Sequence, residues 1–474
     1  MRKSLIRLTK SKLAFAFSMV AAAAFVGGTR AQAETLADAM VGAYNHSGLI
    51  EKNRALLRAA DEDVAVAVSA LRPIISWSSS LGYDYSRYRS SGTTVRSEGL
   101  DASVGLSAEL LLYDGGASRM SVDVAKESVL ATREALVSAE QQVLLNAVQA
   151  FLEVRRATEF VTLGRNNVRV IREELKAARD RFEVGEVTRT DVSLAEARLA
   201  AAQGQLAGSE GDLATAGEYY LATVGRKPGK LSTPKAISLP AKSLDGAKAL
   251  ALRTHPDMKR AQRLVTVAEL QILVAKAQMK PTVKLSGSYG LQEEIGSSDY
   301  SRSGSVGLTA TAPIYQGGRL SALARKAQAQ RDSVRGDLHT TRHTLAQQVG
   351  NAWSGLRVAR ASAAASEGQV RASRVAFRGV REEATLGSRT TLEVLDAEQE
   401  LLDARASLVS ARIDEIGAGY SLLASMGLLT ADRLKLNVPS YDPAAYYNLV
   451  KTAPAKLSKQ GQQLDRVLKK LGKE

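Results

Sequence analysis

One stretch of this sequence occurs twice, and no other feature constrains the fold as strongly. Residues 113–225 align with residues 315–427 at a constant offset and without a gap. Matching positions recur along the whole alignment: Tyr113-Asp114-Gly115-Gly116 with Tyr315-Gln316-Gly317-Gly318, Gly185 with Gly387, Thr188 with Thr390, Ala195-Glu196 with Ala397-Glu398, and Gly225 with Gly427. Self-similarity at a fixed spacing indicates two copies of one structural unit. The sequence therefore predicts an internal tandem duplication.

The N-terminus has the features of a secretory signal peptide. A basic start is followed by an apolar run from Leu13 to Val26 and then by Ala31-Gln32-Ala33, an A-x-A cleavage site. We predict that residues 1–33 are removed and that the mature chain starts near Glu34. A membrane anchor helix is the alternative, but the apolar run is short and ends in Gly27-Gly28.

Composition excludes several function classes. The chain has 474 residues, no cysteine and four histidines, so disulfides, thiolate chemistry and a lipidated cysteine are absent. No nucleophile, base and orienting group can be assembled, and we expect neither an enzyme nor a cofactor. Loss of residues 1–33 removes six cations and lowers the formal net charge from +15 to +9. An exported chain rarely meets nucleic acid, so the remaining basicity, densest in the tail, is interpreted as solvated helix faces, with contact to anionic lipid headgroups or a protein partner as the alternative.

Two segments alternate between apolar and polar residues over membrane-strand length. One helix is expected from 36 to about 70 and its copy from 244 to about 279, ended by Pro73 and Pro281. The hairpins 74–112 and 282–314 follow. Their apolar positions include Ile75, Trp77, Leu81, Leu100, Val104, Leu106, Leu285, Tyr289, Val306 and Leu308. Such alternation is typical of transmembrane β-strands with a polar, wet lumen.

Two hairpins on a soluble sheet are the alternative interpretation. The polar positions are mostly Ser, Gly and Thr, which suits a lumen, and the signal peptide makes an outer membrane accessible. Four strands cannot close a barrel, and open edges are not tolerated in lipid. The barrel must then be shared between subunits.

Each hairpin leads into a very long helix, 117–182 and 319–383, with heptad-spaced apolar residues and many alanines. At the standard rise, the first would extend about 100 Å. Each helix turns at a glycine into a returning helix, 190–225 and 390–427. Repeat 1 thus covers 34–225 and repeat 2 covers 244–429, joined by a connector, 226–243, and followed by a basic tail, 430–474, expected to be partly ordered at best.

The residues resemble the TolC family of outer-membrane efflux proteins. The resemblance is carried by the Tyr-Asp-Gly-Gly and Tyr-Gln-Gly-Gly turns, the duplication, and the segment from Gly387 to Glu398. It implies a membrane α+β fold in which a homotrimer forms a twelve-stranded β-barrel, four strands per chain, continued by a long α-helical coiled-coil barrel. It further implies localisation in the outer membrane of a Gram-negative cell, and partnership with a periplasmic adaptor and an inner-membrane transporter of RND or ABC type.

The resemblance also implies roles for the turn segments, here called the tips. Asp191 and Arg389 match salt-bridge partners between neighbouring subunits, with Thr190 beside them. Glu393 and Asp396 match an acidic ring at the entrance. The adaptor-docking residues would be Val184, Gly185, Leu386 and Gly387. The sequence departs from the family where a tyrosine would lock to Thr190, because Ala384 stands there.

Other patterns favour plainer interpretations. His339 and His343 share a helix face but have no third ligand in the pattern, so we expect no metal site. Trp77, Tyr83, Tyr85 and Tyr88 are expected to form a membrane-interface belt rather than only to pack in a sheet. The acids at the tips, without the resemblance, would be solvated helix ends. Two functions remain: a gated duct that exports drugs, toxic compounds or proteins by type I secretion, and a secreted coiled-coil structural protein or adhesin.

Overall fold

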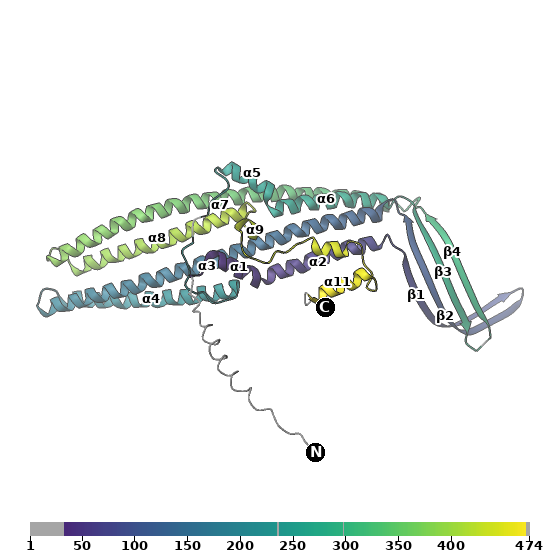
Figure 1. Ribbon diagram of the computed structural model, residues 1–474, viewed down its shortest axis with the longest axis horizontal. Helices are drawn as coiled ribbons and strands as arrows, with labels where there is room; N and C mark the ends of the chain where they lie inside the picture. Colours follow the sequence, from purple (N-terminus) through teal and green to yellow (C-terminus); the bar gives the residue numbers. More distant parts are fainter. Residues whose placement is uncertain (1–32, 235–236, 297, 471–474) are drawn as a thin grey trace, which may run out of the picture.

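The computed structural model describes residues 33–234, 237–296 and 298–470. The predicted signal peptide lies outside these residues except for Ala33. The described chain is an elongated body of long helices lying side by side, with a curved sheet at one end (Figure 1). Within the described ranges, no helix is both long enough and apolar enough to cross a membrane.

Each repeat begins with two short helices, and the expectation of a single one is wrong. They are α1 (Leu36–His46) and α2 (Gly48–Ser69) in repeat 1, and α5 (Leu244–Thr254) and α6 (Pro256–Ala277) in repeat 2. Ser47 has extended backbone, and its hydroxyl accepts a hydrogen bond from the Ile50 N–H at 3.3 Å. His255 precedes Pro256, which disfavours the helical conformation for it. Both interruptions therefore have a local cause, a capping side chain or a proline.

The long helices α3 (Ala117–Glu183) and α7 (Arg319–Thr385) have 67 residues each. The returning helices are α4 (Arg189–Val224) and α8 (Thr391–Ser425), and all four end within two residues of the expected bounds. Each long helix packs along its returning helix, α3 on α4 and α7 on α8. In addition, α3 contacts α1, α2, α6 and α8, whereas α7 packs mainly on α5 and α6 among the other described helices. In this arrangement α3 is central and α7 lies at an edge (Figure 1).

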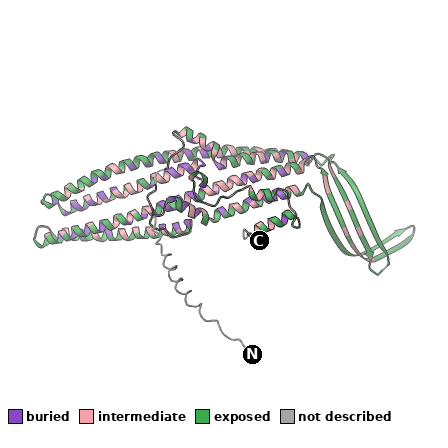
Figure 2. Cartoon of the chain, viewed as in Figure 1, coloured by how far each residue is buried: buried purple, intermediate pink, exposed green. Residues whose placement is uncertain are grey.

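The largest apolar cluster lies where both repeats meet at mid-length. Leu144 and Phe151 of α3, Tyr220 of α4 and Leu422 of α8 are each 0% exposed. Buried positions elsewhere on the long helices are mostly Ala and Val in a narrow stripe (Figure 2). Small residues let the helices approach closely, and beyond the largest cluster the buried apolar residues form smaller separate clusters along the body.

The strands form one antiparallel sheet in the order β1-β2-β3-β4. Their bounds are β1 (Ile74–Ser90), β2 (Thr93–Tyr113), β3 (Thr282–Glu294) and β4 (Tyr300–Thr311). Ser91 and Gly92 both have positive φ, 50° and 85°, which is the two-residue type I′ turn that matches strand twist. The sheet joins the two repeats because β2 pairs with β3.

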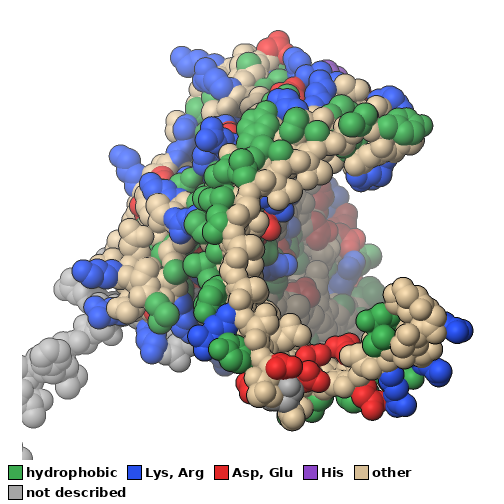
Figure 3. Space-filling model, turned by 90° about the vertical axis from the view of Figure 1, so that its right-hand side faces the viewer, with side chains coloured by type: hydrophobic (Ala, Val, Ile, Leu, Met, Phe, Trp, Pro, Cys, Tyr) green, Lys and Arg blue, Asp and Glu red, His purple; other side chains and the backbone are tan. Residues whose placement is uncertain are grey.

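The strand register gathers the alternating apolar residues on one face. Trp77 is opposite Leu106, Leu106 is opposite Tyr289, and Leu285 is opposite Leu308; directly opposed residues share a face. Seen from the strand end, hydrophobic side chains gather along one side of the sheet, and the other side faces a hollow (Figure 3). On the polar face, the Ser80 and Ser103 hydroxyls lie 2.8 Å apart, as do those of Ser288 and Ser305.

The aromatic side chains on β1 do not all share this face. Trp77, Tyr83 and Tyr85 lie on the apolar face and are 55–69% exposed. Tyr88 is an odd number of residues away from each of them, so strand alternation places it on the polar face. The single belt expected from the sequence is therefore wrong for Tyr88.

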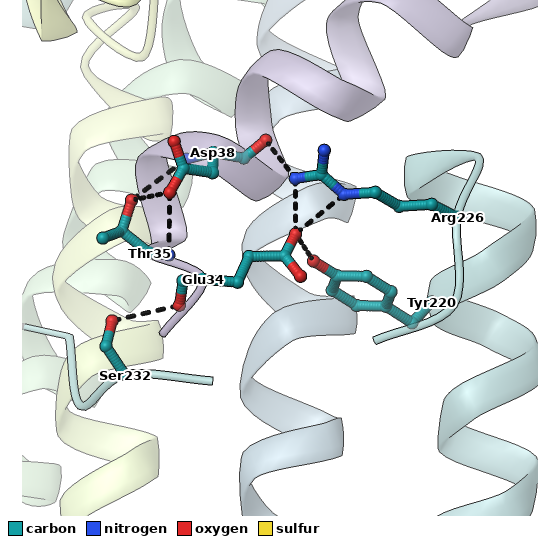
Figure 4. Close-up of polar contacts among 6 residues, drawn as sticks. All are labelled: Glu34, Thr35, Asp38, Tyr220, Arg226 and Ser232. Atoms are coloured by element: carbon teal, nitrogen blue, oxygen red, sulfur yellow. Dashed lines mark hydrogen bonds and ion pairs between the residues drawn. The ribbon is translucent and has the colours of Figure 1, made fainter. Parts of the chain in front are cut away.

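The connector is tied to the start of repeat 1. Glu34 accepts hydrogen bonds from the Tyr220 hydroxyl at 2.5 Å and from Arg226 at 2.6 Å (Figure 4). Its backbone pairs with residue 231 in an isolated parallel bridge. Tyr220 is buried, and burial together with Glu34 raises its pKa. The residues that follow the predicted cleavage site thus clamp the two ends of repeat 1 together.

The tail is more ordered than the sequence suggested. It forms α9 (Ala431–Leu434), α10 (Ala445–Val450) and α11 (Lys459–Lys470). Its tyrosines pack on the short helix α2: the Arg54 guanidinium lies 4.6 Å from the Tyr441 ring centroid, and the Tyr446 hydroxyl donates to Glu62 at 2.6 Å. These tyrosine contacts explain why the tail is ordered. They were not expected, because the basic composition of the tail alone does not indicate them.

Candidate functional site

The two tips, at the end of the molecule opposite the sheet, are built alike. After α3, Gly185 has φ 81°, the Glu186 N–H donates to the Arg181 carbonyl, and the Gly185 N–H donates to the Phe182 carbonyl, both at 3.0 Å. Gly387 has φ 78°, and Gly387 and Ser388 make the equivalent bonds. This is the Schellman ending, which favours glycine because φ is positive. It leaves Val184 and Leu386 projecting, 71% and 83% exposed.

A capping box starts each returning helix and uses two of the predicted site residues. Asp191 accepts hydrogen bonds from the Thr188 hydroxyl at 2.7 Å and from its N–H at 2.9 Å. Glu393 accepts the equivalent bonds from Thr390 at 3.1 and 2.8 Å. These bonds favour the ionised carboxylates and lower the pKa of Asp191 and of Glu393. Both acids therefore stay charged near neutral pH and also fix the helix starts.

Arg389 lies between two acids of its own tip. Its guanidinium contacts Glu383 at 2.8 Å and Glu393 at 2.9 Å. In the described chain no contact joins Arg389 to Asp191, the partner expected from a neighbouring subunit. Both nevertheless line one groove of about 660 Å³ between the tips. Thr190, in the first turn of α4, is exposed outside that lining.

Two further positions singled out in the sequence lie where the helical hairpins α3–α4 and α7–α8 meet. Asp396 of α8 pairs with Arg198 of α4 at 2.7 Å. Ala384, where the family pattern has a tyrosine, is 6% exposed and lines the groove floor. Alanine has no hydroxyl, so this side chain cannot donate the hydrogen bond to Thr190 that a tyrosine at this position would make.

A buried carboxylate above the tips was missed by sequence reasoning. Glu398 on α8 is 8% exposed, and among the described residues its Oε2 has no hydrogen-bond partner. Burial, with the Glu174 carboxylate nearby, raises the pKa of Glu398 to about 7 against the opposing charges of Arg381, Arg405 and Arg169. Its repeat counterpart Glu196 was visible in the alignment, but nothing local shows that only one of the two is buried.

The histidines do not gather with other ligands. His339 and His343 lie on the exposed side of α7. Across the described ranges, no three His, Asp or Glu side chains are grouped so that they could hold a metal ion.

Comparison with known proteins agrees with this architecture. The profile of the outer membrane efflux protein family matches residues 43–219 and 249–428, one match in each repeat. The outer membrane efflux protein BepC of Brucella suis is 36% identical over 440 residues, covering 91% of this chain and 95% of its own. The alkaline protease secretion protein AprF of Pseudomonas aeruginosa is 27% identical over 377 residues, covering 75% and 78%.

Solved structures share the fold. The outer membrane protein VceC of Vibrio cholerae superposes with a TM-score of 0.71 at 20% identity, covering 83% of this chain and 96% of its own. The CmeC outer membrane channel of Campylobacter jejuni superposes with a TM-score of 0.74 at 16% identity, covering 89% and 90%.

These findings confirm the expected fold class. Three chains contribute four strands each to one β-barrel, which closes the open edges of β1 and β4, and the helices continue it as a barrel. The protein lies in the outer membrane and is an export duct of a family whose members are not enzymes, and the adhesin alternative is discarded. The duplicated helix–hairpin unit, the open four-stranded sheet and the sequence match together show that this chain belongs to the outer membrane efflux protein family.

Proposed function

We propose that the groove between the tips is the gate of the duct. The observation that carries this proposal is that Asp191, Arg389 and Glu393 line one groove at the end farthest from the sheet. Arg389 already holds two carboxylates of its own tip, so a neighbouring Asp191 would join an existing charge network. Such a network closes the tip, and Thr190 lies beside it.

Glu393 and Asp396 are proposed to form the acidic ring at the entrance. Repeated by three-fold symmetry, two acids per chain place six carboxylates near the axis and favour cations. Glu393 is charged because its capping bonds lower its pKa. Asp396 also forms an ion pair with Arg198 of α4. It would therefore serve both the acidic ring and the contact between the helical hairpins α3–α4 and α7–α8.

Val184 and Leu386 are proposed to dock a periplasmic adaptor. Each is an exposed apolar side chain held on a rigid turn by Gly185 or Gly387. An apolar knob on a fixed turn suits a protein interface, where buried anchors contribute most of the binding energy. The adaptor would link the duct to an inner-membrane transporter of RND or ABC type. Drugs and small toxic compounds are cargo compatible with BepC, and proteins are compatible with AprF.

Single-channel conductance in planar bilayers tests the gate. We expect Arg389→Ala to raise the open-state conductance or open time, because the charge network loses its cation. Arg165→Ala is the matched control, since Arg165 forms an exposed pair with Glu210 at 2.9 Å, away from the tips. Glu393→Ala with Asp396→Ala should abolish cation preference. Equal conductance in the Arg389 and Arg165 variants would sink the gate proposal.

A further inference from the structure

The C-terminal segment returns to the end of the helical body that carries the sheet. After α10 the chain turns through residues 451–457, which we name the C-terminal apex, and then reverses into α11. In Figure 1 this turn is the part of the C-terminal segment nearest the strands. It has no counterpart in repeat 1.

A specific contact fixes the level of the apex along the molecule. Arg72 stands two residues before β1, and its guanidinium donates to the Ala453 carbonyl at 2.7 Å and to the Thr452 carbonyl. Ile75, near the start of β1, is 74% exposed on the lipid-facing side of the sheet. The apex is thus held where the helical body meets the membrane surface.

The apex has a defined shape. Val450, just before it, is 0% exposed, and the Lys451 N–H donates to the Tyr447 carbonyl at 2.9 Å. Just after it, the Ser458 hydroxyl donates to the Ala455 carbonyl at 2.6 Å and accepts from the Gly461 N–H at 3.0 Å. Hydrogen bonds on both sides of the C-terminal apex therefore fix its backbone, and with it the side chains that point to solvent.

Those side chains combine one large apolar group with cations. Leu457 is 90% exposed, and Lys451, Lys456 and Lys459 around it are exposed as well. Lysine is depleted in protein–protein interfaces, which disfavours a protein partner here. An exposed leucine ringed by lysines suits the lipid interface, where the apolar group enters the headgroup region and the ammonium groups contact phosphates.

We propose that the C-terminal apex is a membrane-surface anchor that binds anionic phospholipid headgroups of the periplasmic leaflet beside the barrel. Leu457 inserts at the boundary of the acyl chains. Lys456 and Lys459 contact the phosphates. Through Arg72, the anchor would hold the C-terminal end of α2 at the membrane surface.

The absence of cysteine allows a direct test. The variant Leu457→Cys in the full trimer carries one nitroxide label per chain, and Ser388→Cys at the exposed tip is the matched control. Both are reconstituted in nanodiscs of phosphatidylcholine with phosphatidylglycerol, in nanodiscs of phosphatidylcholine alone, and in detergent. Collision rates with oxygen and with a polar nickel chelate report immersion in lipid.

We expect the oxygen-to-nickel ratio at position 457 to be several-fold above that at position 388 in phosphatidylglycerol nanodiscs. Lys456→Glu with Lys459→Glu should lower the ratio at position 457 to the control value. A label at 457 that is as water-accessible as the one at 388 overturns the proposal. So does an equal ratio in the two nanodiscs, or shielding from both reagents in detergent, which would indicate burial against a neighbouring subunit.

Discussion

The hairpins α3–α4 and α7–α8 have matching lengths and tips but different surroundings. Twenty residues of α3 are buried within the chain, against ten of α7, although each helix has 67 residues. The reason is position: α3 is covered on several sides, whereas α7 lies at the edge of the layer. We expect a neighbouring subunit of the trimer to cover part of the uncovered side of α7, though less closely than the chain itself covers α3. Duplication therefore copies the helix and not its environment.

The same difference appears in one ion pair. Arg179 and Glu196 join α3 to α4 at 2.7 Å, both exposed. Their counterparts do not pair: Arg381 reaches across to Glu174 of α3 at 3.3 Å, and Glu398 is buried. An intrahairpin contact in repeat 1 has become an interhairpin contact in repeat 2. Relative movement of the hairpins would disturb the second arrangement and leave the first intact.

The largest expected effect is in the core. Phe151 is 0% exposed, and its counterpart Trp353 is partly exposed. Phe151→Ala should destabilise the protein by about 3–5 kcal/mol, because a buried ring leaves a cavity. Trp353→Ala should lower the free energy of unfolding by clearly less, because the Trp353 ring is already partly exposed. Thermal unfolding followed by the helical circular dichroism signal measures both, and equal losses would show that the trimer buries α7 as fully as the chain buries α3.

A second difference lies at the ends of the returning helices. Gly225 and Gly427 both have positive φ, but an added Cβ would meet the His46 side chain at the first and the His255 backbone, at 2.5 Å, at the second. Gly427→Ala should cost about 3 kcal/mol, since left-handed strain adds to a clash that cannot relax. Gly225→Ala should cost less, because the His46 side chain can shift away from the added Cβ, which leaves left-handed strain of about 1–2 kcal/mol as the main term. The reverse ranking in thermal unfolding would contradict the environment assigned to Gly427.

The third effect depends on pH. The pKa of Glu398 is raised by burial from 4.5 to about 7, so its proton is bound more tightly in the folded state. The stability this provides is complete below pH 4.5, falls as pH rises, and is lost above about pH 7. Glu398→Gln should therefore match the native protein at low pH and exceed its stability by roughly 1–3 kcal/mol at pH 8.

Glu196→Gln is the control for that experiment. It removes an exposed ion pair and should cost about 0–1 kcal/mol without gaining stability as pH rises. Unfolding temperatures measured for both variants between pH 4 and 8 decide the matter. If the difference between Glu398→Gln and the native protein does not change with pH, Glu398 is not the buried acid described here.

The smallest expected loss of stability comes from removing the helix cap at either tip, and it tests whether the two tips are energetically alike. Thr188→Ala and Thr390→Ala each remove a helix cap and should each cost about 1 kcal/mol. Hydrogen exchange at the first turn of α4 and of α8 would locate the loss. A larger effect at Thr390 would show that the Arg389 network depends on its cap, whereas Thr188 has no such network.

Much of the candidate site could be predicted because its parts are local. A glycine followed three residues later by threonine, with an acid three residues beyond, predicts the turn, the cap and the returning helix at both tips. The ion-pair partners of the site residues could not be predicted. Glu383 and Arg198 have no feature in the sequence that assigns them to Arg389 and Asp396.

By itself, the sequence determined the duplication, the period-2 strands, the lengths of the long helices and the capped tips, because each depends on residues a few positions apart. The tertiary structure alone decided that α3 is central, that Glu398 is buried while Glu196 is exposed, and that the tail packs against Arg54. These outcomes depend on packing between segments that lie up to hundreds of residues apart in the sequence. Two copies with the same local pattern can then acquire different burial and charge.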